Sequence, residues 1–129
     1  MIKLAILGAT GRMGSCIAAL IAGDERFDLV AALTVSDDPR LGETIRTGGR
    51  SVATSESTDA PFDVLIDFSV PEATVRWLGQ CRRAGAAMVI GVTGYTDEQQ
   101  RRIADASREI AVLQASNFSV GVNLLLSLV

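Results

Sequence analysis

The chain has 129 residues, of which 48% are hydrophobic and 5% aromatic, so it can form one domain with an aliphatic core. Twelve basic and fifteen acidic residues give a net charge of −3 with no Lys/Arg run, which excludes nucleic acid as a partner. No apolar run reaches the roughly 18 residues of a membrane span, and no signal peptide is recognisable. We therefore expect a soluble, cytoplasmic protein with no membrane contact.

Reactive side chains are few. The sequence has no His, Lys3 is its only Lys and Tyr95 its only Tyr. Enzymes that transfer hydride or acyl groups normally take their proton donor from these residue types. We therefore expect that an enzyme containing this sequence has part of its machinery elsewhere. Cys16 and Cys81 are expected as two buried thiols in helices, in a reducing compartment, rather than as a disulfide or metal pair.

Apolar strands alternate with helices, the pattern of a Rossmann-like α/β fold: a doubly wound, mostly parallel sheet with helices on both faces. The expected strands cover residues 3–7, 29–33, 51–54, 64–68, 88–90 and 112–114. "VLIDF" and "AMVIG" are nearly continuous apolar runs, which is typical of strands buried on both faces. Residues 36–50 are polar and contain glycine, so we expect a mobile loop there.

The first strand leads into "GATGRMG", in which Gly8, Gly11 and Gly14 are three residues apart, and a helix is expected over residues 12–22. In a strand–loop–helix unit, Gly8 permits a tight turn and Gly11 lets the backbone approach a pyrophosphate. Gly14 lets the helix pack closely on the strand. The spacing differs from the commoner G-x-G-x-x-G, and a tight turn without a ligand is the alternative.

The second strand normally ends at an Asp or Glu that binds the ribose hydroxyls of NAD. Here Thr34 stands at that point, so no carboxylate is expected to repel a 2′-phosphate, and Arg12 or Arg40 can pair with one. This pattern favours NADP over NAD. NAD stays open, because Asp37 or Asp38 reaches the ribose if the following loop folds back.

Two helices have sequence signals at their amino ends. In "SVPE", Ser69 is the expected N-cap and Glu72 completes a capping box, with Pro71 in the first turn. In "TDEQ", Thr96 and Gln99 repeat the capping box, and that helix is expected to end at about residue 108.

Three segments follow strands at the carboxyl edge of the sheet, where such folds bind ligands. "GVTG" at 91–94 and "ASNFS" at 115–119 offer small residues, one hydroxyl and one amide, which suit a nicotinamide ribose and its carboxamide. Two ordinary turns, with Asn117 and Ser119 capping a helix, are the alternative. Asp67 in "IDFS" is expected to order its loop rather than act as a catalytic base.

The final segment, "NFSVGVNLLLSLV", begins as a helix after Ser119 and stops in apolar residues with no polar face. We expect that the chain is cut where a helix enters another domain. Residues 1–118 would then form a dinucleotide-binding domain, and residues 119–129 would begin the helix that leads to a missing C-terminal substrate-binding and catalytic domain.

The motifs "GATGRMG", "DFSVPEAT", "GVTG" and "ASNFSVGVN", in this order and spacing, resemble the N-terminal domain of bacterial dihydrodipicolinate reductase. That family, also called 4-hydroxy-tetrahydrodipicolinate reductase, acts in the lysine and diaminopimelate pathway. The resemblance covers essentially the whole chain. It implies NADH or NADPH as hydride donor, a cyclic dihydrodipicolinate substrate bound with the second domain, and a homotetramer in the full-length protein.

The resemblance also implies where the cofactor lies: residues 8–13 at the pyrophosphate, and residues 91–93 with 115–118 at the nicotinamide, where Thr93 would also touch substrate. The family's catalytic His and Lys belong to the second domain, so we assign no catalytic residue and no metal ligand here. The expected cofactor-binding residues are Gly8, Ala9, Thr10, Gly11, Arg12, Met13, Thr34, Phe68, Gly91, Val92, Thr93, Ala115, Ser116, Asn117 and Phe118.

The chain departs from the family pattern at three positions. Thr34 replaces the usual acidic ribose ligand, Val35 the Arg that often follows it, and Val92 the usual Thr. Two rival interpretations are an atypical short-chain reductase and a non-enzymatic NAD(P)-sensing or nucleotide-binding module. The first needs a Tyr with a Lys four residues on, but Tyr95 is followed by Gln99.

Overall fold

The computed structural model describes residues 1–47 and 50–115 and contains ten helices and strands within them. In chain order these are β1 (Ile2–Leu7), α1 (Arg12–Ala22), β2 (Phe27–Leu33), β3 (Thr44–Thr47), β4 (Arg50–Ser55), β5 (Val64–Asp67), α2 (Pro71–Ala84), β6 (Ala87–Ile90), α3 (Asp97–Ala106) and β7 (Val112–Gln114).

The strands form one seven-stranded sheet in the order β3-β4-β2-β1-β5-β6-β7. Every neighbouring pair is parallel except β3 and β4, which are antiparallel. From β1 the chain winds outward first through β2 and then, from β5, in the other direction, so β1 and β5 flank the point where the strand order reverses. The predicted doubly wound, Rossmann-like fold is confirmed, and its ligands are expected at this reversal, beyond the carboxyl ends of the strands.

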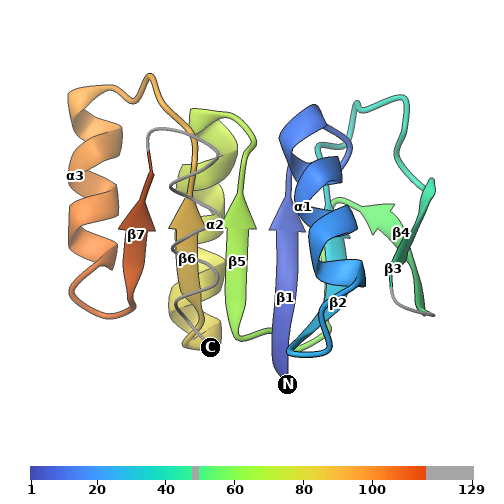
Figure 1. Ribbon diagram of the computed structural model, residues 1–129. Helices are drawn as coiled ribbons and strands as arrows, with labels where there is room; N and C mark the ends of the chain where they lie inside the picture. The colour runs from blue at the N-terminus through green and yellow to red at the C-terminus, as the bar shows by residue number, and fades with distance from the viewer. Residues whose placement is uncertain (48–49, 116–129) are drawn as a thin grey trace.

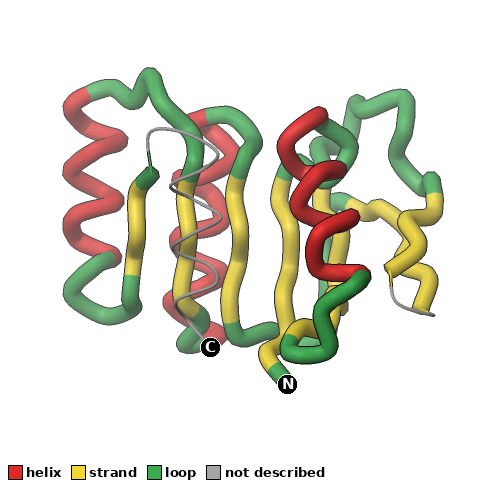
Figure 2. Tube along the Cα trace, viewed as in Figure 1, coloured by secondary structure: helices red, strands yellow, loops and turns green. Residues whose placement is uncertain are grey.

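Side chains that alternate along the strands build two cores, one on each face of the sheet. Leu4 and Ile6 of β1 pack with α1, whereas Ala5 and Leu7 pack with α2 and α3. All four are fully buried. Figure 1 shows α1 in front of the sheet and α2 behind it, with the parallel arrows ending at one common edge. In Figure 2 the loops that leave the strands gather along that edge.

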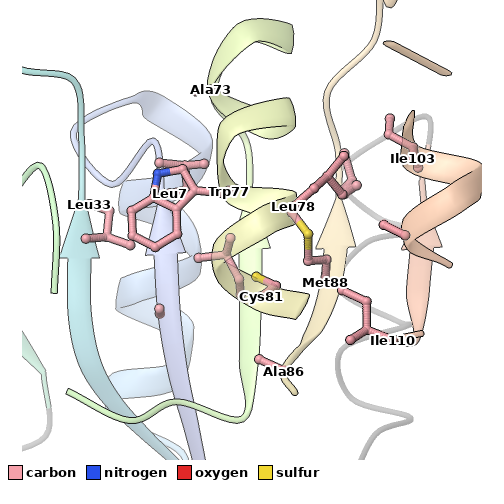
Figure 3. Close-up of a cluster of buried hydrophobic side chains, with 14 of the residues drawn as sticks. Leu7, Leu33, Ala73, Trp77, Leu78, Cys81, Ala86, Met88, Ile103 and Ile110 are labelled. Atoms are coloured by element: carbon pink, nitrogen blue, oxygen red, sulfur yellow. The ribbon is translucent and has the colours of Figure 1, made fainter. Parts of the chain in front are cut away.

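The core behind the sheet centres on α2. The indole of Trp77, 4% exposed, reaches across to Leu7 and Leu33, the last residues of β1 and β2 (Figure 3). Cys81 is fully buried in the same cluster, and burial raises the pKa of its thiol to about 12. Cys16, by contrast, is exposed on α1. The prediction of two buried thiols is therefore right for Cys81 and wrong for Cys16, which lies on the outer side of its helix.

The polar segment 36–50 contains a strand that the sequence did not predict. β3 pairs with β4 from Thr44 opposite Ala53 to Thr47 opposite Arg50. Ile45 packs against the core on the α1 face, and the other residues of β3 are polar. A single inward apolar side chain is enough for a sheet-edge strand, but it is too weak a periodicity to recognise in the sequence.

Of the two predicted capping boxes, the one at α3 is confirmed and the one at α2 is wrong. At α3, Thr96 accepts from the Gln99 amide and the Gln99 side chain accepts from the Thr96 amide, so the capping box is confirmed. At α2 the N-cap is Val70, with Pro71 as the first helical residue, and no side chain caps the helix. The Ser69 hydroxyl donates instead to the Asp67 carboxylate, which competes successfully for it.

Within residues 1–47 and 50–115, no helix combines the length and apolar character that crossing a membrane requires.

Candidate dinucleotide-binding site

The turn after β1 requires glycine at its first position. Gly8 has φ +83°, in the left-handed region, and its amide donates to the Leu33 carbonyl at 2.9 Å. A Cβ at Gly8 would lie 2.8 Å from the carbonyl oxygen of Phe68, at the end of the neighbouring β5. Both the backbone conformation and the close approach of two strands therefore exclude a side chain here.

The other two glycines have different surroundings. A Cβ on Gly14 would lie 2.2 Å from the Gly8 carbonyl oxygen, so Gly14 permits close packing of α1, but against the turn that follows β1, where the sequence predicted the strand itself. Gly11 is exposed with φ −76°, and a Cβ there would lie 3.3 Å from the same oxygen. Of the three glycines, Gly11 is therefore the one where an added Cβ needs the smallest adjustment, a slight shift of the Gly8 carbonyl.

The amino end of α1 suits an anion. Its N-cap is Gly11, which has no side chain to accept hydrogen bonds from the first turn, and that turn begins with Arg12 and Met13 and contains no acidic residue. The first amides of a helix have no partner within the helix, and the helix dipole adds positive potential. Such an end holds the phosphates of nucleotides in other strand–loop–helix units.

A cleft of about 260 Å³ opens beside this turn, at the ends of β1, β2 and β5. It brings together five residues that the sequence analysis assigned to the cofactor and five that it did not. The assigned residues are Gly8, Thr10, Gly11, Thr34 and Phe68. The others are Leu7, Val35, Asp38, Ser69 and Val70, of which Asp38 is expected only as an alternative ribose contact. Val70 follows the carboxyl end of β5 directly, so the same edge argument that selected Asp67 and Ser69 could have found it.

Of the residues predicted to hold the pyrophosphate, Ala9, Arg12 and Met13 are not among those lining the cleft. Ala9 is fully buried, its amide donates to the Leu33 carbonyl, and its carbonyl accepts from the Ser15 hydroxyl. Ala9 therefore shapes the turn. Arg12 and Met13 lie in the first turn of α1, where they can offer backbone amides to an anion.

The loop after β2 folds back over the glycine turn. The hydroxyls of Thr10 and Thr34 both donate to Oδ2 of Asp38 at 2.5 Å, and the Arg40 amide donates to its Oδ1 at 2.8 Å. The Thr10 hydroxyl, then that of Thr34, then the Arg40 amide hold the pKa of Asp38 below its ordinary value of 3.8. Thr34 itself is not acidic, as the sequence shows, but the alternative that the sequence left open is the one found: the loop folds back and brings the Asp38 carboxylate to the end of β2.

Arg40 fastens this loop to the glycine turn. Its Nη1 donates to the Thr10 carbonyl at 2.8 Å, and its Nε contacts Oε2 of Glu43 at 2.5 Å. The guanidinium therefore has two partners within the chain. One is a carboxylate, which offsets the cation beside the cleft.

Asp67 is a fully buried carboxylate at the end of β5. It accepts from the Ser69 amide at 2.9 Å, from the Ser69 hydroxyl at 2.5 Å and from the Thr74 hydroxyl. Burial raises its pKa, and the hydrogen bonds from Ser69 and Thr74 oppose that rise. All these contacts join β5 to the start of α2, so the geometry gives Asp67 the loop-ordering role that the sequence predicted.

Tyr95 extends this network. Its hydroxyl donates to Oγ1 of Thr74 at 3.1 Å, and burial raises the pKa of Tyr95 to about 12. A phenol with that pKa stays protonated near neutral pH. Tyr95 therefore holds the loop between β6 and α3 against α2 and is poorly suited to donate a proton.

A second cavity, of about 520 Å³, lies at the ends of β6 and β7. Its lining contains the predicted Val92, Thr93 and Ala115, and also Gly94, Tyr95, Gln100 and Gln114. Gly91 lies under Phe68, since a Cβ on it would be 2.0 Å from the Phe68 ring. The predicted Ser116, Asn117 and Phe118, and the proposed domain boundary after 118, lie outside the described residues.

Fold and cleft together define a class of protein. A glycine turn and an uncapped helix at the reversal point of a doubly wound sheet make a nucleotide-binding domain of the kind that oxidoreductases use for nicotinamide dinucleotides. Over residues 2–118 the sequence matches the family described as "Dihydrodipicolinate reductase, N-terminus". The chain belongs to that family, as its motifs indicated.

Solved structures agree with this assignment. The chain is similar to a dipicolinate-bound dihydrodipicolinate reductase from Paenisporosarcina sp. TG-14, with 25% identity and a TM-score of 0.72, covering 99% of this chain and 52% of that one. Aspartate semialdehyde dehydrogenase II from Vibrio cholerae shares the fold at 18% identity and TM-score 0.69, with 91% and 42% covered. The Candida albicans aspartate semialdehyde dehydrogenase with NADP also shares the fold, at 16% identity and a TM-score of 0.64. That match covers 94% of this chain and 44% of the other. The chain spans about half or less of the length of these proteins.

Proposed function

We propose that this chain is the cofactor-binding domain of an NAD(P)H-dependent 4-hydroxy-tetrahydrodipicolinate reductase of lysine and diaminopimelate biosynthesis. The observation that carries the proposal is the cleft formed by Gly8, Gly11 and the uncapped start of α1 in a chain of this family. The dipicolinate bound to a similar reductase supports the substrate class, a cyclic dicarboxylate.

The two cavities suit the two ends of a dinucleotide laid along the carboxyl edge of the sheet. The amides at the start of α1 bind the pyrophosphate, and the cleft beside Thr10 and Thr34 takes the adenosine ribose. Val92 and Thr93 border the cavity that takes the nicotinamide. Bound NADH or NADPH supplies the hydride that reduces the cyclic dihydrodipicolinate intermediate. The chain's own part is to hold and orient the cofactor.

We further propose that this chain binds cofactor but does not turn over substrate by itself. It has no His, and Lys3 lies near the start of β1, whereas the cleft lies beyond its end. Tyr95, the only Tyr, is engaged with Thr74. The proton donor would come from a second domain, which would also complete the homotetramer. A nucleotide sensor predicts the same binding, and dihydrodipicolinate-dependent oxidation of NAD(P)H by a longer protein separates the two functions.

The direct test is titration with NADH and NADPH of the wild-type chain and of Gly11→Val. Valine is compatible with the φ of Gly11, and its Cβ requires only a slight shift of the Gly8 carbonyl, but it fills the mouth of the cleft, so binding should weaken by roughly ten-fold or more. Gly23→Val is the matched control, because Gly23 follows the other end of α1 and a Cβ there meets nothing within 4 Å. Equal binding by all three folded chains would contradict the proposal.

A further inference from the structure

In this chain, a loop residue supplies the carboxylate at the end of β2, the place where related folds contact the adenosine ribose. In doubly wound domains the acidic residue that binds the ribose stands directly at the end of the second strand. In this chain β2 ends at Leu33, and the next residue, Thr34, is 5% exposed with its hydroxyl turned to Asp38. The carboxylate therefore reaches the end of β2 from the following loop.

Three donors fix that carboxylate at the cleft. Thr10 comes from the glycine turn and Thr34 from the end of β2, so the two hydroxyls join the two elements that border the cleft. The Arg40 amide holds the other oxygen. An ionised carboxylate has about four lone-pair sites, of which these donors take three. One acceptor site remains for a hydroxyl of the ligand.

The charge beside Asp38 disfavours an added phosphate. Arg40 is paired with Glu43 and bonded to the Thr10 carbonyl, so Asp38, Arg40 and Glu43 together carry one negative charge. Arg12, the other cation that the sequence offered, is not among the residues lining the cleft. A 2′-phosphate would therefore meet a fixed carboxylate, whereas a 2′-hydroxyl would find an acceptor.

We propose that Asp38 is the specificity-determining residue of this cleft, and that it selects NADH over NADPH by accepting the 2′-hydroxyl of the adenosine ribose. The inference rests on the proposed function, since it assumes that the cleft holds the adenosine half of a nicotinamide dinucleotide. It reverses the preference for NADP that Thr34 alone suggested. Thr10 and Thr34 are the positioning residues that allow the loop acid to replace an acid in the strand.

The test measures dissociation constants for NADH and NADPH with the wild-type chain, Asp38→Asn and Asp37→Asn. Reduced nicotinamide absorbs where indole emits, so quenching of Trp77, the only Trp, reports the binding of either cofactor. Asp37 is exposed on the same loop, so its variant removes the same charge one residue from the Thr10 and Thr34 contacts. We expect wild type to favour NADH by about ten-fold or more. Asp38→Asn should bring that ratio near one, and Asp37→Asn should largely keep it.

Two results overturn the inference while leaving the proposed function intact. One is a wild-type preference for NADPH. The other is an NADH-to-NADPH ratio that Asp38→Asn leaves unchanged, or changes no more than Asp37→Asn. Failure of the folded wild-type chain to bind either cofactor, or an undiminished affinity in Gly11→Val, instead overturns the proposed function and the inference with it.

A ligand-side test does not depend on the variant folding. The wild-type chain should bind 2′-deoxy-NADH about ten-fold more weakly than NADH, because the deoxy compound leaves the Asp38 acceptor without its hydroxyl. In folded Asp38→Asn the two ligands should bind nearly alike. Equal affinity of wild type for both ligands would contradict the role of Asp38.

Discussion

The two cavities at the carboxyl edge of the sheet are built differently. The cleft at β1, β2 and β5 is held by a glycine turn, by backbone packing between strands and by three donors on Asp38. The cavity at β6 and β7 is twice as large and is lined by small or neutral side chains. In the binding mode that we propose, the chain thus fixes the adenosine and pyrophosphate end of a dinucleotide in detail. At the proposed nicotinamide end, residues 92–95 with Gln100, Gln114 and Ala115 line the cavity, and none of these described residues is a suitable proton donor.

The largest difference between the two regions is expected when alanine replaces a glycine of positive φ in each, Gly8 at the cleft and Gly94 at the larger cavity. Gly8→Ala should destabilise the chain by about 3 kcal/mol, because a left-handed backbone is combined with a clash against the Phe68 carbonyl. Gly94→Ala should cost only about 1 kcal/mol, since φ is +86° but nothing lies within 4 Å of the added Cβ. Urea unfolding measures both, and equal costs would mean that β5 does not constrain the glycine turn.

The contact of Phe68 with Gly91 links the two cavities. Gly91→Ala places a methyl group 2.0 Å from a ring carbon of Phe68, so the ring must turn, at a cost of about 2 kcal/mol. Because Phe68 lines the cleft that we propose for the adenosine, NADH binding should weaken as well. Gly91→Ala should cost less in a Phe68→Leu chain, and a double-mutant cycle measures that difference. Strict additivity would contradict a direct link.

A smaller effect is expected at the loop between β6 and α3. Tyr95→Phe removes the hydrogen bond to Thr74 and should lower the free energy of unfolding by about 1 kcal/mol. Binding of ADP, which uses only the other cavity, should not change. Isothermal titration of ADP with both chains tests this separation, and a large loss of ADP affinity in Tyr95→Phe would contradict it.

The smallest effect is the pH dependence that Asp67 contributes, because burial and hydrogen bonding act on its pKa in opposite directions. Its pKa is raised in the folded chain, so the native state binds more protons than the unfolded state between the ordinary value of 3.8 and the raised one. The contribution of Asp67 to stability is therefore full below that window and decreases as the pH rises through it. As the pH is lowered from neutral to about 4, the free energy of unfolding of wild type should therefore increase relative to that of Asp67→Asn. Urea unfolding of both chains at these two pH values measures the difference.

The sequence predicted those parts of the structure that follow from local signals. Buried strands, the glycine turn and the Thr96 capping box are each encoded within a few residues, and all three are present. It did not predict β3, whose single inward apolar residue gives no period. It also misplaced the cap of α2, because Ser69 has a competing partner, Asp67, that only the tertiary structure orients.

The candidate site shows the same limit. Thr34 at the end of the strand favours a cleft without a carboxylate, and a loop that folds back with Asp37 or Asp38 is the alternative that the sequence leaves open. Asp38 reaches that end only because Thr10 and Arg40 hold the loop across it. These contacts span 28 and 30 positions of the sequence, and no pattern of neighbouring residues reveals them. The glycine turn is a local feature and could be predicted, whereas the proposed ribose contact depends on the tertiary fold.

The measurement that tests the account most directly is amide chemical-shift mapping of the chain with ADP and, separately, with reduced nicotinamide mononucleotide. Each compound is one half of the cofactor. We predict saturable ADP binding, with the largest shifts at residues 8–13 and 34–40, and much weaker binding of the mononucleotide. Tighter binding of the mononucleotide, or ADP-induced shifts confined to residues 91–95, would contradict the claim that the glycine turn and Asp38 form the main anchoring site.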